Sequence, residues 1–155
     1  MTKRTISIVL SLCLILSMAL ASQPSQVNAA TSAPKAIDGY TYQRTLSETV
    51  TVEDQKDQEA NKAIGLAIVG VWAGFHSFTA GTVITALGLE GPIKQLTGNT
   101  EKKHPYKIYH FTYKRNGFPD DGDINNYGYY IVAVENLDNG KVVYSERKTI
   151  SRNAF

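Results

Sequence analysis

Residues 63–89 read AIGLAIVGVWAGFHSFTAGTVITALGL, a run of 27 residues without a charged side chain. Lys62 precedes the run and Glu90 follows it. A segment of this length and composition either forms apolar helical structure in the core of a domain or spans a lipid bilayer. The run therefore decides what kind of fold the chain can adopt.

Small side chains recur in this run at helical spacing. Alternating steps of four and three residues from Ala63 meet a small residue at seven of eight positions, the exception being Ile84. The seven are Ala63, Ala67, Gly70, Gly74, Ser77, Gly81 and Gly88. On a helix they would form a flat ridge that another backbone can approach closely. The pattern resembles the glycine zipper of membrane-inserting and oligomerising segments.

The run supports two interpretations. Its length and lack of charge favour a helix that spans or enters lipid, or that associates with a second copy of the chain. Its five glycines, three threonines and His76 make it only moderately apolar, which favours a helix or hairpin buried against a sheet. The sequence around residues 76–79 is the weakest helical point. One helix and a helical hairpin therefore both remain open.

The N-terminus predicts export. Lys3 and Arg4 precede an apolar core at residues 6–20, as in a secretory signal peptide. Cleavage sites of small residues end at Ala21 and at Ala29, and we prefer the second because residues 22–28 form a polar c-region. We expect a signal peptide over residues 1–29 and a secreted, bacterial protein.

The only cysteine, Cys13, lies within the predicted signal. The mature chain therefore has neither a disulfide nor a cysteine metal site, and we expect it to be stabilised by burial alone. Without Lys3 and Arg4, the 16 basic residues fall to 14 and equal the 14 acidic ones. A neutral chain without a concentrated basic face is not expected to bind nucleic acid.

The mature chain is expected to be one domain. Residues 30–39 read as a flexible leader, and residues 40–155 as a single α+β domain. Residues 40–52 alternate strictly, with many Thr, Tyr and Val side chains, and predict a strand with one covered and one wet face. Thr51, followed by Glu53 and Asp54, has the character of a helix start, and Gly91-Pro92 is expected to end the helical region.

Three further strands are predicted at residues 106–114, 127–135 and 141–150. The last two flank a compact turn at residues 136–140 that contains the favoured Asn139-Gly140 pair. The expected fold is thus one N-terminal strand, a long apolar Gly-rich helical segment over residues 63–89, and a three-stranded antiparallel meander.

Aromatic residues gather in the predicted strands. Tyr109, Phe111 and Tyr113 share one strand face, and Tyr127 and Tyr129 share another. Tyrosine offers a large contact area with a polar end, which suits the binding of sugars, peptides or wall polymers. These five residues are therefore a candidate binding face, although tyrosines at strand spacing are also ordinary sheet residues.

Metal sites and catalysis have weak signals. Asp121, Asp123 and Asn125 match the start of a calcium loop, but Asn126 and Val132 stand where its glycine and glutamate belong. The three histidines, His76, His104 and His110, have no acidic cluster at metal-site spacing. Because no catalytic motif is present, we expect neither an enzyme nor a cofactor.

Two functions are consistent with these features. In the first, a secreted, non-enzymatic protein acts on membranes or associates with the cell envelope, as an antimicrobial bacteriocin or toxin does. Its partner would be membrane lipid or a second copy, met through the small-residue ridge. In the second, a soluble extracellular binding or inhibitory module meets a cell-wall polymer or a protein through the tyrosine-rich sheet. The sequence alone favours the first.

Overall fold

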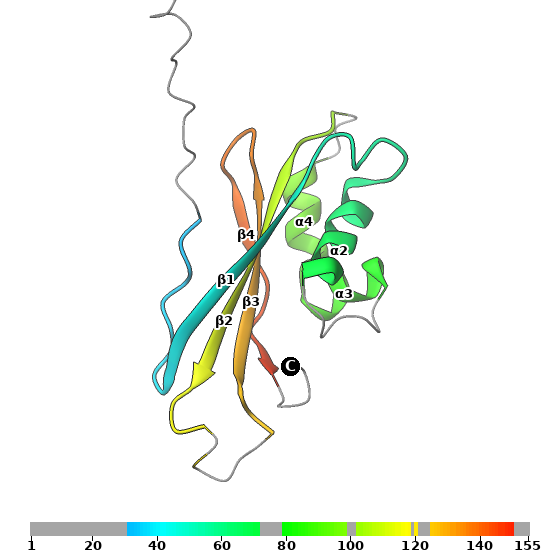
Figure 1. Cartoon of the computed structure of the whole chain (residues 1–155). Coiled ribbons are helices and arrows are strands. Elements are labelled where there is room, and N and C mark those ends of the chain that lie inside the picture. Colours follow the sequence, from blue (N-terminus) through cyan, green and yellow to red (C-terminus); the bar gives the residue numbers. More distant parts are fainter. Residues whose placement is uncertain (1–30, 72–78, 99–101, 119, 121–124, 151–155) are drawn as a thin grey trace, which may run out of the picture. The chain divides into compact units, whose positions relative to one another are not determined.

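The structure, a computed structural model, describes residues 31–71, 79–98, 102–118, 120 and 125–150. Its strands form one antiparallel sheet in the order β1 (Tyr40–Val50), β2 (Tyr106–Arg115), β3 (Gly128–Asn136) and β4 (Val142–Tyr144), with β5 (Lys148–Ile150) also paired to β3. Three short helices, α2 (Ala60–Val71), α3 (Ala80–Ala86) and α4 (Glu90–Thr97), lie on one face of the sheet (Figure 1). The expected mixed α+β fold is confirmed.

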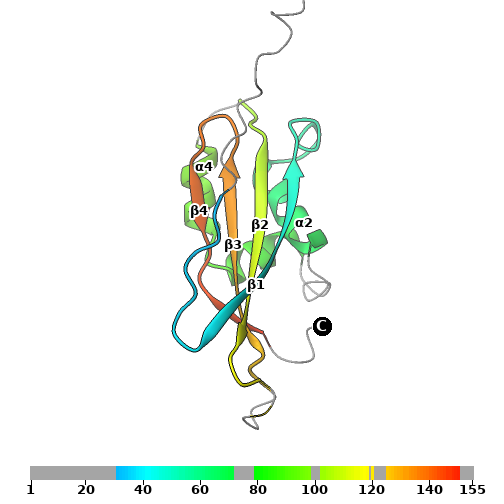
Figure 2. The same cartoon turned by 60° about the vertical axis from the view of Figure 1, so that its left-hand side comes forward.

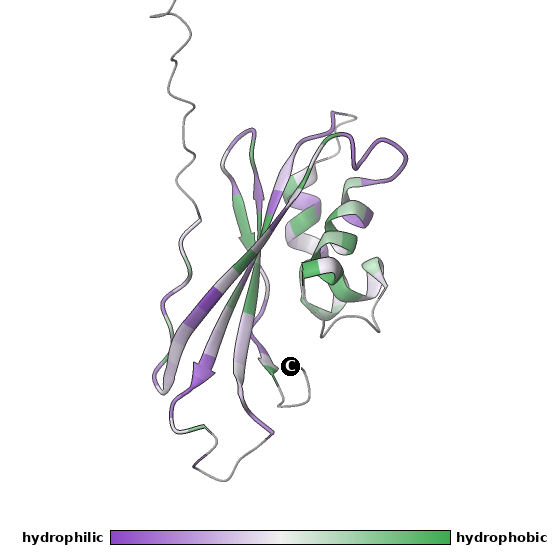
Figure 3. Cartoon of the chain, in the orientation of Figure 1, coloured by the Kyte–Doolittle hydropathy of each residue, from purple (hydrophilic) through white to green (hydrophobic). Residues whose placement is uncertain are grey.

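Alternation along β2 and β3 gives the sheet two buried faces. The face toward the helices, called the helix face, carries side chains that join the core with the apolar residues of α2, α3 and α4. From the strands these are Tyr106, Ile108, Tyr130, Val132 and Val134, and from the helical region Ile64, Ile68, Val83, Leu87, Leu89 and Ile93. Figure 3 shows α2 and α3 as largely hydrophobic.

The apolar run is not one long helix in the described residues. Thr79 has an extended backbone and caps α3, exchanging hydrogen bonds with Thr82, so helical structure begins anew at Ala80. Of residues 76–79, where a hairpin bend was left open, only Thr79 belongs to the described part of the chain, because residues 72–78 lie outside it. Among the described residues, no helix combines the length and apolar character needed to cross a membrane.

The two short helices touch at Gly65. A Cβ placed on Gly65 would lie 2.3 Å from the backbone oxygen of Ala80, so only glycine permits this approach. The close contact between backbones therefore exists within one chain, between α2 and α3, and its glycine is not a member of the predicted ridge.

The two ends of the helical region differ from expectation. Thr51 and Asp54 do exchange capping bonds, with Thr51 N donating to Asp54 Oδ2 at 2.7 Å and Asp54 N donating to Thr51 Oγ1 at 3.1 Å. These bonds close only a series of turns, and α2 begins at Ala60. At the other end, Gly91-Pro92 falls within the first turn of α4, where a missing N–H costs no helical hydrogen bond.

The edge strand β1 lacks the covered face expected of it. Val50 is its only buried residue, while Tyr42 and Leu46 are exposed. The register shifts between Tyr42 and Arg44, which interrupts the alternation read from the sequence. The last predicted strand is also divided, because residues 145–147 separate β4 from β5.

The face opposite the helices is covered by residues 31–38, called the N-terminal strap (Figure 2). Tyr113 Oη donates to Pro34 O at 2.5 Å, Ile37 N donates to Tyr129 Oη at 3.2 Å, and Thr31 Oγ1 donates to Glu135 at 2.9 Å. The strap has no regular secondary structure. The segment expected to be a flexible leader thus packs on the sheet.

Candidate functional site

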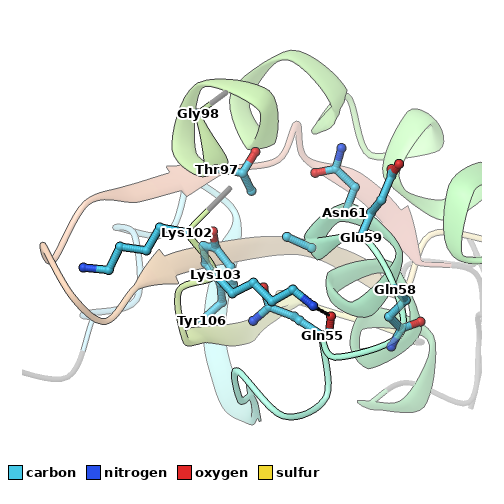
Figure 4. A pocket seen from close by; sticks show the side chains of 10 residues that line it. Gln55, Gln58, Glu59, Asn61, Thr97, Gly98, Lys102, Lys103 and Tyr106 are labelled. Carbon is cyan, nitrogen blue, oxygen red and sulfur yellow. Dashed lines mark hydrogen bonds between the residues drawn. The ribbon is translucent and has the colours of Figure 1, made fainter. Parts of the chain in front are cut away.

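A polar pocket opens where four parts of the fold meet: the turns at residues 51–59, the start of α2, the end of α4 and the start of β2. Its volume is about 270 Å³. It is lined by Gln55, Gln58, Glu59, Ala60, Asn61, Thr97, Gly98, Lys102, Lys103 and Tyr106 (Figure 4). This volume is many times the ~30 Å³ share of one water molecule in the liquid, so the pocket has room for a small ligand.

Gln55 forms the floor of the pocket and is fully buried. Its amide nitrogen donates to Thr51 O at 2.9 Å and to His104 O at 2.6 Å, which fixes the orientation of the amide. The Lys103 ammonium donates to the backbone oxygens of Gln55 and, at 3.0 Å, of Lys56. These bonds join the turns to the start of β2 across nearly fifty residues of sequence.

Two amide oxygens at this site lack a donor. Gln55 Oε1 and Asn61 Oδ1 are both buried and have no hydrogen-bond partner among the described residues. Leaving such an oxygen unsatisfied costs about 1–3 kcal/mol. In Figure 4 the Asn61 amide points across the pocket toward Thr97. Both oxygens are closed off from solvent as the side chains stand, so a ligand with O–H or N–H groups would reach them with a rotation of the lining side chains.

Tyr106 contributes an uncharged hydroxyl to the lining. Burial, and then the negative charge of Asp138, raise the pKa of Tyr106 above its ordinary value. The phenol therefore remains a neutral donor over the physiological range. Together with the amides and the Thr97 hydroxyl, it gives a lining rich in hydrogen-bonding groups.

The five described members of the predicted membrane or oligomer ridge do not lie on one helix, because Ala63, Ala67 and Gly70 belong to α2, Gly81 belongs to α3 and Gly88 follows α3. Ala63 and Ala67 are buried in the core, Gly81 has open space at its Cβ position, and Gly88 has a φ of +67° beyond the end of α3. Gly70 faces Glu48. The remaining two, Gly74 and Ser77, lie outside the described residues.

Four of the five residues of the candidate aromatic face lie together in the structure, but other parts of the chain cover them. Tyr109, Phe111, Tyr113 and Tyr129 lie together on the strap side, where the rings of Tyr113 and Tyr129 stack at 4.5 Å. All four are at most 5% exposed. Tyr127 lies apart from them, packing beside the helix-face core and against Phe118 at 5.0 Å. In this conformation the face has no free surface to offer a partner.

The structure describes only some of the weak metal candidates. Asp121 and Asp123 lie outside the described residues, so the structure places only Asn125 of the calcium pattern. Across the ranges it does describe, no three His, Cys, Asp or Glu side chains could hold a metal. His104 Nδ1 lies 2.6 Å from Asp138, and His110 is buried within the sheet, which lowers its pKa to about 4.

Comparison with known proteins gives no further guide, since no family model, curated protein or solved structure matches the chain. Sequence reasoning missed the pocket because Gln55, Asn61 and Thr97 are ordinary polar residues in turns and at helix ends. Residues 53–62 contain neither Gly nor Pro and follow the helix start predicted at Thr51, so nothing in the sequence distinguishes Gln55 from an ordinary helical residue.

Proposed function

We propose that this chain is an exported, non-enzymatic binding module whose small polar ligand enters the pocket of Gln55, Asn61, Thr97 and Tyr106. The observation that carries the proposal is the unpartnered Oε1 of the fully buried Gln55. An acceptor that is costly to leave unsatisfied gains a hydrogen bond when a ligand arrives. This belongs to the second class of function considered above, with the pocket replacing the covered tyrosine face.

The test is a binding titration followed by NMR on the ¹⁵N-labelled secreted form of the chain. The probes are a soluble digest of bacterial cell wall, free sugars, amino acids and inorganic phosphate. Because Gln55 and Asn61 have side-chain NH₂ groups, their resonances report directly on the site. A probe that shifts both resonances in a saturable way supports the proposal, and a panel in which none does so overturns it.

A second candidate, contact with a membrane surface, is favoured by an apolar groove between α2 and α3. The groove has a volume of about 570 Å³ and includes Leu66, Val69 and Ile84, with Lys62 also in its lining. Leu66 is 49% exposed, so the groove keeps apolar surface in contact with solvent. An apolar surface beside a cation suits an anionic lipid interface.

Liposome flotation tests this second candidate. The wild-type chain should float with vesicles rich in phosphatidylglycerol, and Leu66→Gln should reduce the floated fraction several-fold. Gln58→Ala, at a residue that lines the polar pocket and not the groove, is the matched control and should float as the wild type does. Wild-type protein that stays in the aqueous phase would remove membrane contact as a function.

A further inference from the structure

We propose that the pocket binds one neutral saccharide unit, such as the terminal residue of a glycan. The inference rests on the binding function proposed above and names the chemical class of its ligand. It depends on three properties of the pocket: its lining has both hydrogen-bond donors and acceptors, its lysine side chains are bonded elsewhere or turned away, and its volume is small.

The hydrogen-bonding groups of the pocket match hydroxyls. Gln55 Oε1 and Asn61 Oδ1 need donors, whereas the Tyr106 phenol can donate. A hydroxyl donates one hydrogen bond and accepts up to two, so neighbouring hydroxyls on a sugar ring can serve both kinds of group at once. A carboxylate or a phosphate monoester dianion brings only acceptors and would leave both amide oxygens unsatisfied, and hydrogen phosphate brings a single O–H donor for the two oxygens.

The two lysine side chains of the lining, Lys102 and Lys103, are not placed to hold an anion in the pocket. The Lys103 ammonium is already held by two backbone oxygens, those of Gln55 and Lys56. In Figure 4 the Lys102 side chain extends away from the other lining residues. The Glu59 carboxylate also lines the pocket, and it would repel a negative ligand while accepting from a neutral hydroxyl.

The size of the pocket limits the ligand to one ring. Its volume of about 270 Å³ falls just below the ~300 Å³ at which pockets for drug-sized ligands begin. A single six-membered sugar ring with its substituents is smaller than a drug-sized ligand and suits a pocket of this volume. A longer glycan would leave its remaining units in solvent, so the terminal unit should supply most of the affinity.

The experiment compares N-acetylglucosamine and glucose with alanine and inorganic phosphate as ligands of the ¹⁵N-labelled secreted chain. We expect a neutral sugar to shift the side-chain NH₂ resonances of Gln55 and Asn61, with phosphate and alanine at least tenfold weaker. Asn61→Ala should weaken sugar binding at least tenfold. Lys62→Ala, at the next residue of α2, which lines the apolar groove instead, should bind as the wild type does.

The outcomes separate this inference from the function on which it rests. Saturable shifts with phosphate or alanine but not with sugar would overturn the saccharide assignment and leave a binding pocket in place. The absence of shifts with every probe, the cell-wall digest included, would overturn both. Sugar binding that survives equally in Asn61→Ala would place the saccharide elsewhere on the chain and would also overturn the assignment.

Discussion

The two faces of the sheet are covered in opposite ways. On the helix face, aliphatic side chains from three helices pack against the strands, and two helical backbones touch at Gly65. On the other face, a strap without regular structure covers tyrosines and is held by hydrogen bonds to their hydroxyls. The first cover depends on shape and apolar area, and the second depends on a few polar contacts. The helix face should therefore respond most to changes of volume, and the strap face to the loss of single hydroxyls.

The largest effect is expected from Gly65→Ala. The added methyl would lie 2.3 Å from Ala80 O, and because that atom belongs to the backbone of α3, the two helices would have to move apart. We expect the free energy of unfolding to fall by about 3 kcal/mol or more, at the upper end of overpacking costs. Urea denaturation followed by circular dichroism measures it.

Gly81→Ala is the matched control for Gly65→Ala. It is also a glycine-to-alanine change in a helix of the same hairpin, but nothing lies within 4 Å of the new methyl. The free energy of unfolding should rise by about 0.5 kcal/mol, since alanine restricts the unfolded chain and favours helix. Equal losses in the two variants would show that the contact between Gly65 and Ala80 does not hold the helices.

His110, on the helix face, should make the stability of the fold depend on pH. Burial lowers its pKa from 6.5 to about 4, so between these values the unfolded state binds the proton more readily than the folded one. The stability supplied by the neutral side chain is fully present above pH 6.5 and is lost as the pH falls toward 4. We expect the free energy of unfolding to drop by about 2 kcal/mol from pH 7 to pH 5.

His110→Gln isolates this contribution because glutamine cannot titrate in that range. Urea midpoints at pH 7 and pH 5 should differ much less in the variant than in the wild type. Since all carboxylates are shared by the two proteins, their contribution cancels in the comparison. The same pH dependence in both would mean that His110 is protonated without cost in the folded state.

The strands of the centre of the sheet could be read from the sequence. The predicted range 106–114 ends one residue before β2 does, and the range 127–135 is offset from β3 by one residue at each end. The agreement is close because alternating Tyr, Ile and Val side chains pack on both faces. The Asn139-Gly140 turn could also be predicted from local sequence, because an Asn-Gly pair tolerates the positive φ of a tight hairpin turn. Gly140 has a φ of +66°.

The strap and the pocket could not be read in this way. Gln55 becomes a floor residue only because its amide meets His104 O, which lies 49 positions away in sequence. Pro34 becomes part of a cover only through Tyr113, 79 positions away. No local pattern encodes such contacts. The role of the apolar run could not be decided from the sequence for a related reason, since a charge-free segment gives the same pattern whether it enters lipid or lies against a sheet.

The smallest effect tests the strap directly. Tyr113→Phe removes the hydroxyl that donates to Pro34 O and keeps the ring that stacks on Tyr129. The global free energy of unfolding should fall by only about 1 kcal/mol, the value of one hydrogen bond. Because the strap has few other contacts, its opening should increase more visibly: amide exchange at Ile37, whose N–H is bonded to Tyr129, should accelerate several-fold. Tyr42→Phe, which removes an exposed hydroxyl bonded to Thr45, should leave that exchange rate unchanged. If Tyr113→Phe also leaves it unchanged, apolar contact holds the strap as it holds the helices, and the contrast between the two faces disappears.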